Sequence, residues 1–354
     1  MKKNVLLVLV ALLAIVVAGC GGDTSSNKEK KAEVSKSKIA EMSIENGEYV
    51  ITFSEDGEGG SDTYIAFDVK VKNTGKEQMY VTPDSFSLFE KGEDGKISPD
   101  TSYRTGIEDF EGGKLSSGKS LTGTVLFNID SDKEYTLSYA PSSISEDSKN
   151  DVEVAVDLSK YEKTKKNLDE PKKALDAYID VVLLSKENPD YDKYISTDSE
   201  VAKEAVKKAF TKNFKDYLVY NYKPTDEELT TFFKNFQEIE AKRATYETKV
   251  IGNVGKKAMV EVTMKGLSNE EISDIFSEYK EEYLDQSDEY DSEKAEQYAL
   301  TKYTEVLEKA DLGEPRNELK VVLTKKDDKW DVNLKSNMDG SNEYLLRAFI
   351  GGVE

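Results

Sequence analysis

Few residue types in this chain of 354 residues could carry out catalysis, because histidine is absent and cysteine occurs once, at Cys20. Without histidine, neither a Ser-His-Asp nor a Cys-His arrangement can form, and zinc sites built on histidine are excluded. General acid–base chemistry would rest on Asp, Glu, Lys or Tyr. The 70 acidic residues make carboxylate pairs frequent by chance, so such a pair says little about glycoside hydrolysis. We therefore expect no enzyme, no catalytic residue, no metal and no cofactor.

Cys20 follows a basic start and the short apolar run 5–18, which is too short for a membrane-spanning helix of about 20 residues. A basic start, an apolar core and a small residue before a cut site are typical of a secretory signal. The residues VAGC (17–20) resemble the lipobox of bacterial lipoproteins. The resemblance implies that residues 1–19 are a signal peptide and that the sulfur of Cys20 carries a diacylglyceryl group. An uncleaved signal anchor is the alternative.

Residues 20–38 are small or charged, with Val34 the only large apolar side chain, which predicts a flexible tether. Two acyl chains on one residue suffice for lasting attachment, so we expect a protein anchored at the extracellular face of the cell membrane. A single cysteine also excludes an intramolecular disulfide.

The net charge excludes one class of partner. It is −21, and loss of the two lysines in residues 1–19 makes it −23. Binding to a phosphate backbone normally needs a basic face, so we expect no nucleic-acid partner.

Two acidic groups could suggest a cation site. Asn128, Asp130, Asp132 and Glu134 alternate like calcium ligands, but position six of that loop is Lys133 and the EF-hand pattern fails. We interpret this group as an acidic turn. A second group has twelve acids in residues 268–296, which could recruit cations or a basic partner, although charge runs usually face water. These acids are Glu270, Glu271, Asp274, Glu278, Glu281, Glu282, Asp285, Asp288, Glu289, Asp291, Glu293 and Glu296.

The cluster DYLVYNYKP contains Tyr217, Tyr220 and Tyr222. Flat rings of this kind could stack on sugar rings, which would make a carbohydrate site. We favour the other interpretation, in which amphipathic side chains at a helix end seal a core.

Residues 39–158 contain short runs with the period of half-buried strands, such as Ile65, Phe67 and Val69 in TYIAFDVKVKN. Such runs cover 47–54, 63–73, 79–91, 120–130, 134–141 and 151–158. Turn signals separate them, which predicts a β-sandwich of two antiparallel sheets. Residues 65–96 resemble the telokin-like immunoglobulin-fold domain of many Gram-positive lipoproteins, a family of mostly unknown function for which extracellular binding is proposed.

Residues 159–354 change to helical periodicity, with capping-box patterns at 197–200, 225–228 and 268–271. Helices are predicted from Glu170-Pro171, after each capping box, over 293–310 and over 342–350. Strand patterns return in 245–267 and in the hairpin 319–336, which contains Trp330. Helices on one side of a small curved antiparallel sheet give an α+β domain. This layout resembles the cystatin-like cone and the uncharacterised domain that follows the telokin-like one in Bacillus and Listeria lipoproteins.

The sequence thus predicts a Gram-positive cell-surface lipoprotein that acts as a non-catalytic binding or scaffold module in the cell envelope. Its partners would be the membrane, through the lipid on Cys20, and an envelope protein or wall polymer. The alternative is a small-molecule or lipid carrier with a pocket in residues 159–354. The identity of the ligand, the oligomeric state and the biological process stay open.

Overall fold

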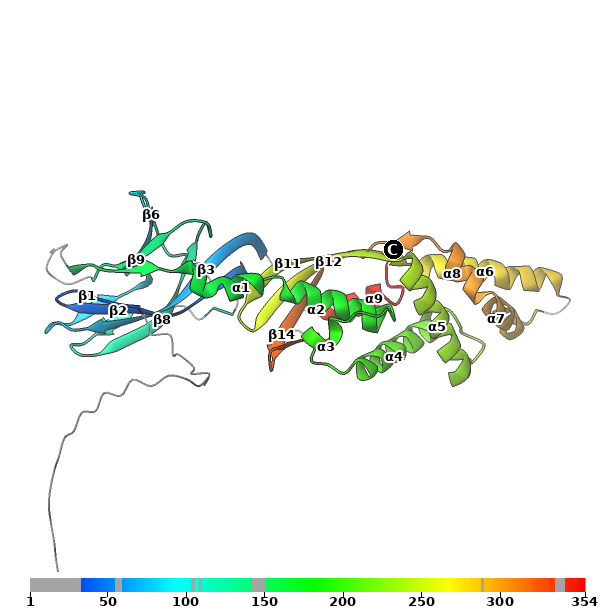
Figure 1. Ribbon diagram of the computed structural model, residues 1–354. Helices are drawn as coiled ribbons and strands as arrows, with labels where there is room; N and C mark the ends of the chain where they lie inside the picture. Colours follow the sequence, from blue (N-terminus) through cyan, green and yellow to red (C-terminus); the bar gives the residue numbers. More distant parts are fainter. Residues whose placement is uncertain are drawn as a thin grey trace, which may run out of the picture. The chain divides into compact units, whose positions relative to one another are not determined.

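The computed structural model describes residues 33–54, 59–102, 106–107, 110–141, 150–287, 290–334 and 341–353 (Figure 1). Strands make up the N-terminal region, residues 33–156, and helices with further strands make up the C-terminal region, residues 158–353. The N-terminal strands are β1 Glu33–Lys36, β2 Ala40–Phe53, β3 Gly59–Asn73, β4 Met79–Val81, β5 Phe86–Glu90, β6 Lys96–Ile97, β7 Gly113–Leu115, β8 Ser120–Asn128, β9 Tyr135–Tyr139 and β10 Val152–Val156.

Eight of the N-terminal strands form two antiparallel sheets around one core, and β4 pairs with β7 separately. One sheet contains β1, β2, β3 and β8, and the other has the order β10-β9-β5-β6. Ile65 and Phe67 of β3 are fully buried, while Lys70 of the same strand is exposed, as the alternation predicts. Phe86 of the opposite sheet joins the same core, with its ring 5.2 Å from that of Tyr139. The predicted antiparallel sheets are therefore confirmed.

The C-terminal region contains nine described α-helices and five strands. They are α1 Glu162–Lys166, α2 Glu170–Tyr178, α3 Tyr191–Tyr194, α4 Ser199–Tyr217, α5 Asp226–Arg243, β11 Thr245–Val254, β12 Lys257–Leu267, α6 Asn269–Gln286, α7 Ser292–Thr301, α8 Tyr303–Lys309, β13 Leu312–Gly313, β14 Leu319–Lys326, β15 Lys329–Asp331 and α9 Ser341–Ala348. Two 3₁₀ turns, η1 Pro83–Ser85 and η3 Leu158–Tyr161, and a π-helical turn, η4 Ile179–Leu183, complete the elements. The predicted combination of helices with an antiparallel sheet is confirmed, and the expected helix over 293–310 is two helices that meet at Lys302.

The two regions share a sheet, which the sequence does not predict. The strand order is β15-β14-β12-β11-β2-β3-β8, and β11 pairs with β2 at Asn253 and Ile51. A cluster of buried side chains lies across this junction: Val50, Phe53, Ala66, Leu126, Ile251, Val254 and Met259. The C-terminal hairpins therefore extend an N-terminal sheet instead of forming a small separate one.

A bulge in β11 lies at this junction. The register between β11 and β12 shifts between Val250 and Gly252, and Gly252 packs against the ring of Phe53 so closely that a Cβ would overlap it. The side chain of the next residue, Asn253, donates hydrogen bonds to the carbonyl oxygens of Asn167 and Leu168 at 3.3 and 3.0 Å. The bulge thus directs one residue into packing and the next into hydrogen bonding.

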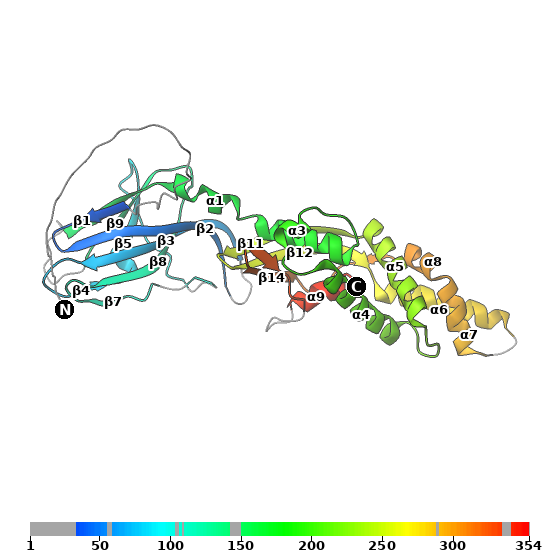
Figure 2. The same ribbon diagram turned by 60° about the horizontal axis from the view of Figure 1, so that its bottom comes forward.

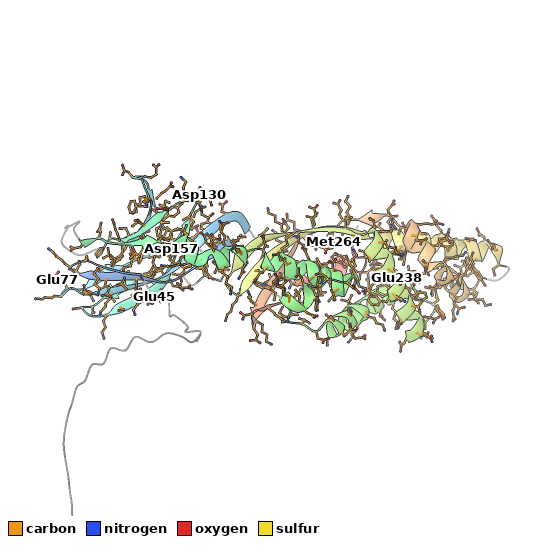
Figure 3. The ribbon with its side chains drawn as sticks, viewed as in Figure 1. Glu45, Glu77, Asp130, Asp157, Glu238 and Met264 are labelled. Carbon is orange, nitrogen blue, oxygen red and sulfur yellow. The ribbon has the colours of Figure 1, made fainter. Side chains whose placement is uncertain are left out.

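The face of the C-terminal sheet that the helices cover is filled by side chains. In both views α2 lies along β11 and β12 (Figures 1 and 2). Val260 and Val321 are fully buried in this core, and the ring of Tyr246 lies 6.3 Å from that of Phe349 near α9. Met264, on β12, belongs to the same core (Figure 3). The interior expected for a cone-shaped pocket is therefore occupied by the protein's own residues.

The capping patterns have different outcomes. Thr225 and Glu228 form the predicted capping box at the start of α5. At α4 the prediction is wrong, because the N-cap is Asp198, whose carboxylate accepts hydrogen bonds from the N–H groups of Glu200 and Val201. The hydroxyl of Thr197 instead donates to Asp331 at 2.7 Å. Ser268 precedes α6 as predicted, without a side-chain cap.

The predicted tether, residues 20–38, is structured at its end, because β1 pairs with β2 in antiparallel register from Glu33 to Lys36. The backbone of β2 offers a free edge here, and the short polar strand completes it. Residues 1–32, and with them Cys20 and the signal peptide 1–19, lie outside the described residues. The change from strands to helices begins at η3, whose Tyr161 still packs on the N-terminal core, 6.0 Å from the ring of Phe67.

Candidate functional site

A cleft of about 840 Å³ opens in the C-terminal region between α4, the start of α6, α9 and the last residues of the chain. We call it the α4–α6–α9 cleft. Its apolar lining comes from Ala209, Leu346, Ile350 and Val353, and its polar lining includes Asn213, Asn269 and Ser273. A concave surface that combines apolar and polar side chains is a usual form for a ligand site.

Hydrogen bonds between distant segments fix the walls of the cleft. Asn213 of α4 donates from Nδ2 to the carbonyl oxygen of Ile350 at 3.0 Å. The N–H of Asn269 donates to the carbonyl oxygen of Gly351 at 2.8 Å. Gly351 has φ +95°, a conformation that favours glycine, and its Cα lies against the side chain of Asn269. The end of the chain is therefore held between α4 and α6.

A buried polar side chain helps to attach the third wall, α9, to the sheet. Asn342 accepts a hydrogen bond from the N–H of Val322 at 2.8 Å and donates to the carbonyl oxygens of Val322 and Asn333 at 2.9 and 3.0 Å. The amide thereby satisfies the backbone of β14 as a neighbouring strand would. This anchor places Leu346 and Arg347 of α9 at the cleft.

Two of the three predicted tyrosines line the cleft. Tyr217 and Tyr220 are 59% and 69% exposed, so the interpretation that they seal a core is wrong for both. The hydroxyl of Tyr220 donates to the carbonyl oxygen of Tyr217 at 3.3 Å, which links the two residues. Tyr222 differs, because its ring is half-buried on the core and its hydroxyl hydrogen-bonds to Glu228 at 2.8 Å.

The tyrosine segment is held by a carboxylate from α7. Glu296 is fully buried and accepts hydrogen bonds from the N–H groups of Tyr220, Asn221 and Tyr222 at 3.2, 2.9 and 2.7 Å. The side chain of Asn221 adds a fourth at 2.8 Å, and Nζ of Lys280 lies 3.9 Å away. Burial alone would raise the pKa of Glu296, but the backbone hydrogen bonds outweigh it and lower the pKa. The carboxylate therefore stays ionised and keeps this segment in place.

Charges of both signs surround the cleft. Three cationic side chains and four carboxylates line it: Lys212, Arg316, Arg347, Asp216, Glu270, Asp274 and Glu343. Arg347 and Glu343 form an ion pair at 2.8 Å. The lining is thus nearly neutral, although the whole chain carries −21.

The twelve predicted acids do not form one surface. Glu278, Glu281 and Asp285 of α6 are exposed to solvent, which agrees with a solvated helix face, and Glu296 is buried. Glu270 and Asp274 line the cleft. Asp288 and Glu289 lie outside the described residues.

The calcium-like group is an acidic turn between β8 and β9, where Figure 3 labels Asp130. A carboxylate oxygen of Asp130 accepts the N–H of Asp132 at 3.0 Å, and Glu134 pairs with Lys91 at 2.6 Å. Over the described ranges, no three acidic or metal-binding side chains are placed to hold a metal ion.

One carboxyl group has an unusual environment away from the cleft. Burial raises the pKa of Glu240 to about 8, although a hydrogen bond from the N–H of Leu267 at 2.9 Å and the charge of Arg243 oppose the rise. The other oxygen of Glu240, Oε1, is buried without a hydrogen-bond partner and lies against Gly266. Because it is enclosed by the core, this group affects how stability depends on pH and is not part of a site.

Sequence reasoning identified Tyr217, Tyr220 and the acids Glu270 and Asp274 but missed the rest of the cleft. Asn213, Arg316 and Arg347 come from segments far apart in the sequence, and none belongs to a local motif. No local sequence pattern could have identified these side chains, because they meet only when the C-terminal residues pack between α4 and α6.

Comparisons with known proteins identify relatives of the whole chain. Uncharacterized lipoprotein YcdA of Bacillus subtilis strain 168 is 28% identical over 359 residues, and the match covers 99% of each chain. The crystal structure of ycdA from that bacterium matches with a TM-score of 0.71 and 25% identity, over 90% of this chain and 99% of that chain. The predicted likeness to a Gram-positive, Bacillus-type lipoprotein is confirmed.

A partial match is the yjhA protein of Bacillus subtilis, at 24% identity over 35% of this chain and 96% of that chain, and its TM-score of 0.27 carries no fold assignment. In the described part of the chain, no helix has the length and apolar character needed to cross a membrane.

Two family models match the chain, with an overlap. Residues 24–173 match the family described as Domain of unknown function (DUF4352). Residues 161–350, more than half of the chain, match a second model. The chain therefore belongs to the family described as Domain of unknown function (DUF5105).

Proposed function

We propose that this protein is a lipoprotein anchored at the extracellular face of a Gram-positive cell membrane and that it acts as a non-catalytic binding module in the envelope. The name of its Bacillus relative supports the lipoprotein part. The pattern VAGC at 17–20 supports attachment through Cys20 after loss of residues 1–19. Two acyl chains on that residue would give lasting attachment.

The proposal assigns a different role to each of the two regions. Residues 39–158 would be an immunoglobulin-like, telokin-like domain, and residues 159–354 a cystatin-like α+β domain. The shared sheet supports a scaffold in which the first region holds the second at a fixed orientation to β2. The α4–α6–α9 cleft would then be the part that meets the partner.

The observation that carries the binding function is the exposure of Tyr217 and Tyr220 at the rim of the cleft. Large aromatic side chains that face solvent next to polar groups are enriched in binding surfaces. Their hydroxyls and rings offer contact area at a low cost in conformational entropy. An envelope protein or a wall polymer is the partner that such a surface would meet outside the cell.

The carrier function is less well supported. A lipid carrier needs a deep apolar cavity, whereas Val260, Val262, Val321 and Phe349 fill the space between the sheet and the helices. The described interior leaves the open cleft as the better candidate site.

A photo-crosslinking experiment tests the binding function in living cells. The full-length protein would carry p-benzoylphenylalanine at Ser273, which lines the cleft, or at Val201, which is 68% exposed on the same helix as Tyr217. We expect a covalent adduct with envelope material at position 273 that is absent at position 201 and absent when Tyr217 and Tyr220 are both replaced by alanine. Equal adducts at both positions, or none at 273, would contradict a binding role for the cleft.

A further inference from the structure

We propose that the ligand of the α4–α6–α9 cleft is an uncharged glycan chain and that Tyr217 and Tyr220 are the platforms on which its sugar rings stack. This inference rests on the proposed binding function and names its ligand class. The first argument is the position of the rings, which are exposed at one rim of an open groove instead of buried in a pocket. An open groove admits an internal segment of a polymer, which a closed pocket would exclude.

The second argument is that the backbone that carries the two tyrosines is held in place before any ligand arrives. Glu296 holds the backbone N–H of Tyr220 at 3.2 Å and those of its two successors at 2.9 and 2.7 Å. The hydroxyl of Tyr220 is bound to the backbone of Tyr217 at 3.3 Å. Tyr217 is the last residue of α4, where the chain is still helical. A preorganised backbone loses little entropy on binding, so weak stacking contacts can give measurable affinity.

The third argument is the charge of the lining. Three cations face four carboxylates, and one of these pairs, Arg347 with Glu343, is already internally neutralised at 2.8 Å. A polyanion would meet the carboxylates of Asp216, Glu270 and Asp274, and a polycation would meet Lys212. An uncharged ligand avoids both repulsions, and the long-range field of a chain with net charge −21 does not oppose it.

The fourth argument is the mixture of donors, acceptors and apolar surface. Sugar hydroxyls both donate and accept hydrogen bonds, and the lining supplies carboxylate acceptors together with the ammonium group of Lys212 and the hydroxyl of Ser273. The C–H faces of sugar rings need apolar contact, which Leu346, Ile350 and the two tyrosine rings supply. Both halves of the chemistry of a neutral glycan are therefore present along one groove.

The test is a titration of the full-length, detergent-solubilised protein with chitohexaose, an uncharged hexamer of N-acetylglucosamine, and with cellohexaose. We expect saturable binding of at least one of them. Tyr217→Ala and Tyr220→Ala should each weaken it about tenfold, which corresponds to about 1.4 kcal/mol of lost contact. Tyr217→Phe should bind as wild type, because stacking uses the ring and not the hydroxyl. Tyr290→Ala is the matched control, since Tyr290 is 86% exposed and does not line the cleft.

Two results would overturn the inference. One is the absence of saturable binding of either glycan at millimolar concentration by a protein with normal thermal unfolding. The other is wild-type affinity in the Tyr217→Ala and Tyr220→Ala variants. If glycans fail while the crosslink at position 273 captures an envelope protein, the ligand class is wrong and the proposed binding function stands. If both fail, the binding function is wrong as well.

Discussion

Glu296 accepts a hydrogen bond of 2.7 Å from the backbone N–H of Tyr222, a residue that precedes it by 74 positions in the chain. The same carboxylate binds the two preceding N–H groups, so one buried side chain satisfies three consecutive backbone donors. Buried backbone N–H groups require partners, and a carboxylate is the strongest neutral-pH acceptor available. The relationship couples the acidic helix pair α6 and α7 to the wall of the cleft.

Replacing Glu296 by glutamine should loosen the tyrosine segment. The amide removes the charge and turns one acceptor into a donor that faces N–H groups, so we expect a loss of about 2–3 kcal/mol in the free energy of unfolding. Because hydrogen bonding lowers the pKa of Glu296 in the folded state, its contribution is fully present above the unfolded pKa of about 4.5 and is lost progressively as pH falls from there through the lower folded-state pKa. Chemical denaturation at pH 7 and pH 4 measures both effects.

Hydrogen exchange gives the local readout for the same variant. The amides of Tyr220, Asn221 and Tyr222 should exchange faster in Glu296→Gln, while those of β12 keep their protection relative to global stability. Glu293→Gln is the control, because Glu293 is exposed in the first turn of the same helix. Equal protection of the three amides in both variants would show that the carboxylate does not hold them.

Replacing Glu240 by glutamine should change how stability depends on pH. Burial raises the folded-state pKa of Glu240 to about 8 from 4.5, so the folded state keeps a proton that the unfolded state releases. The wild type should therefore lose stability as pH rises from 4.5 to 8, by at most about 1.4 kcal/mol per pH unit from this group. Glutamine stays neutral, and we expect Glu240→Gln to exceed wild type by about 2–4 kcal/mol at pH 8.

Denaturant midpoints across pH 4.5 to 8 check this expectation. The two proteins should converge at the acidic end, where the wild-type carboxyl is neutral in both states. The control is Glu238→Gln, two residues earlier on α5, whose side chain is 55% exposed (Figure 3). Parallel curves for Glu240→Gln and wild type would mean that Glu240 is not protonated in the folded protein.

Much of the fold could be predicted because local periodicity decides it. The alternation of apolar and polar residues around Ile65 and Phe67 predicts both their strand and their burial. The capping box of Thr225 and Glu228 predicts the start of α5. The prediction of Thr197 as the N-cap of α4 is wrong because Asp198, one position later, offers a charged acceptor. The hydroxyl of Thr197 instead makes a tertiary hydrogen bond to Asp331. Local patterns cannot choose between two adjacent capping residues when a distant partner decides.

The shared sheet and the cleft could not be predicted for a related reason. The pairing of Asn253 with Ile51 joins two strands from different regions, and the sequence pattern of each strand gives no sign of a partner in the other region. Exposure of Tyr217 depends on where α9 and the C-terminal residues pack, and nothing in the cluster DYLVYNYKP records that position. Periodicity distinguishes the buried face of one helix or strand from its exposed face. The cleft, however, depends on how three helices pack together.

Replacing Gly252 by alanine should destabilise the junction between β2 and β11. A Cβ at this position would overlap the ring of Phe53, which is 2% exposed and cannot move into solvent without leaving its core. We expect a loss of about 1–3 kcal/mol from overpacking, measured as a lower denaturant midpoint. Gly113→Ala is the control in a strand, because a Cβ there meets no atom within 4 Å. A neutral Gly252→Ala would contradict the close packing of this bulge.

Replacing Cys20 by alanine should separate anchoring from folding. Without the sulfur that the proposed lipid modifies, we expect the protein to move from the membrane fraction to the medium or to remain as an unprocessed precursor. The melting temperature should be unchanged, because the described fold begins at residue 33. Fractionation with mass spectrometry of the mature N-terminus makes the measurement, and full membrane retention of the variant with a normal cleavage pattern would contradict the lipid anchor.

The pairing of β2 with β11 has a consequence for folding during synthesis. A chain that emerges N-terminus first presents Ile51 long before Asn253 exists to meet it, with about two hundred residues still to come. During that interval the backbone groups of β2 near Ile51 have no strand partner on this edge, and Phe53 lacks its contact with Gly252. The strand pairing that joins the two regions can therefore form only after residue 253 has been synthesised, and until then this edge of β2 is open to pairing with other strands.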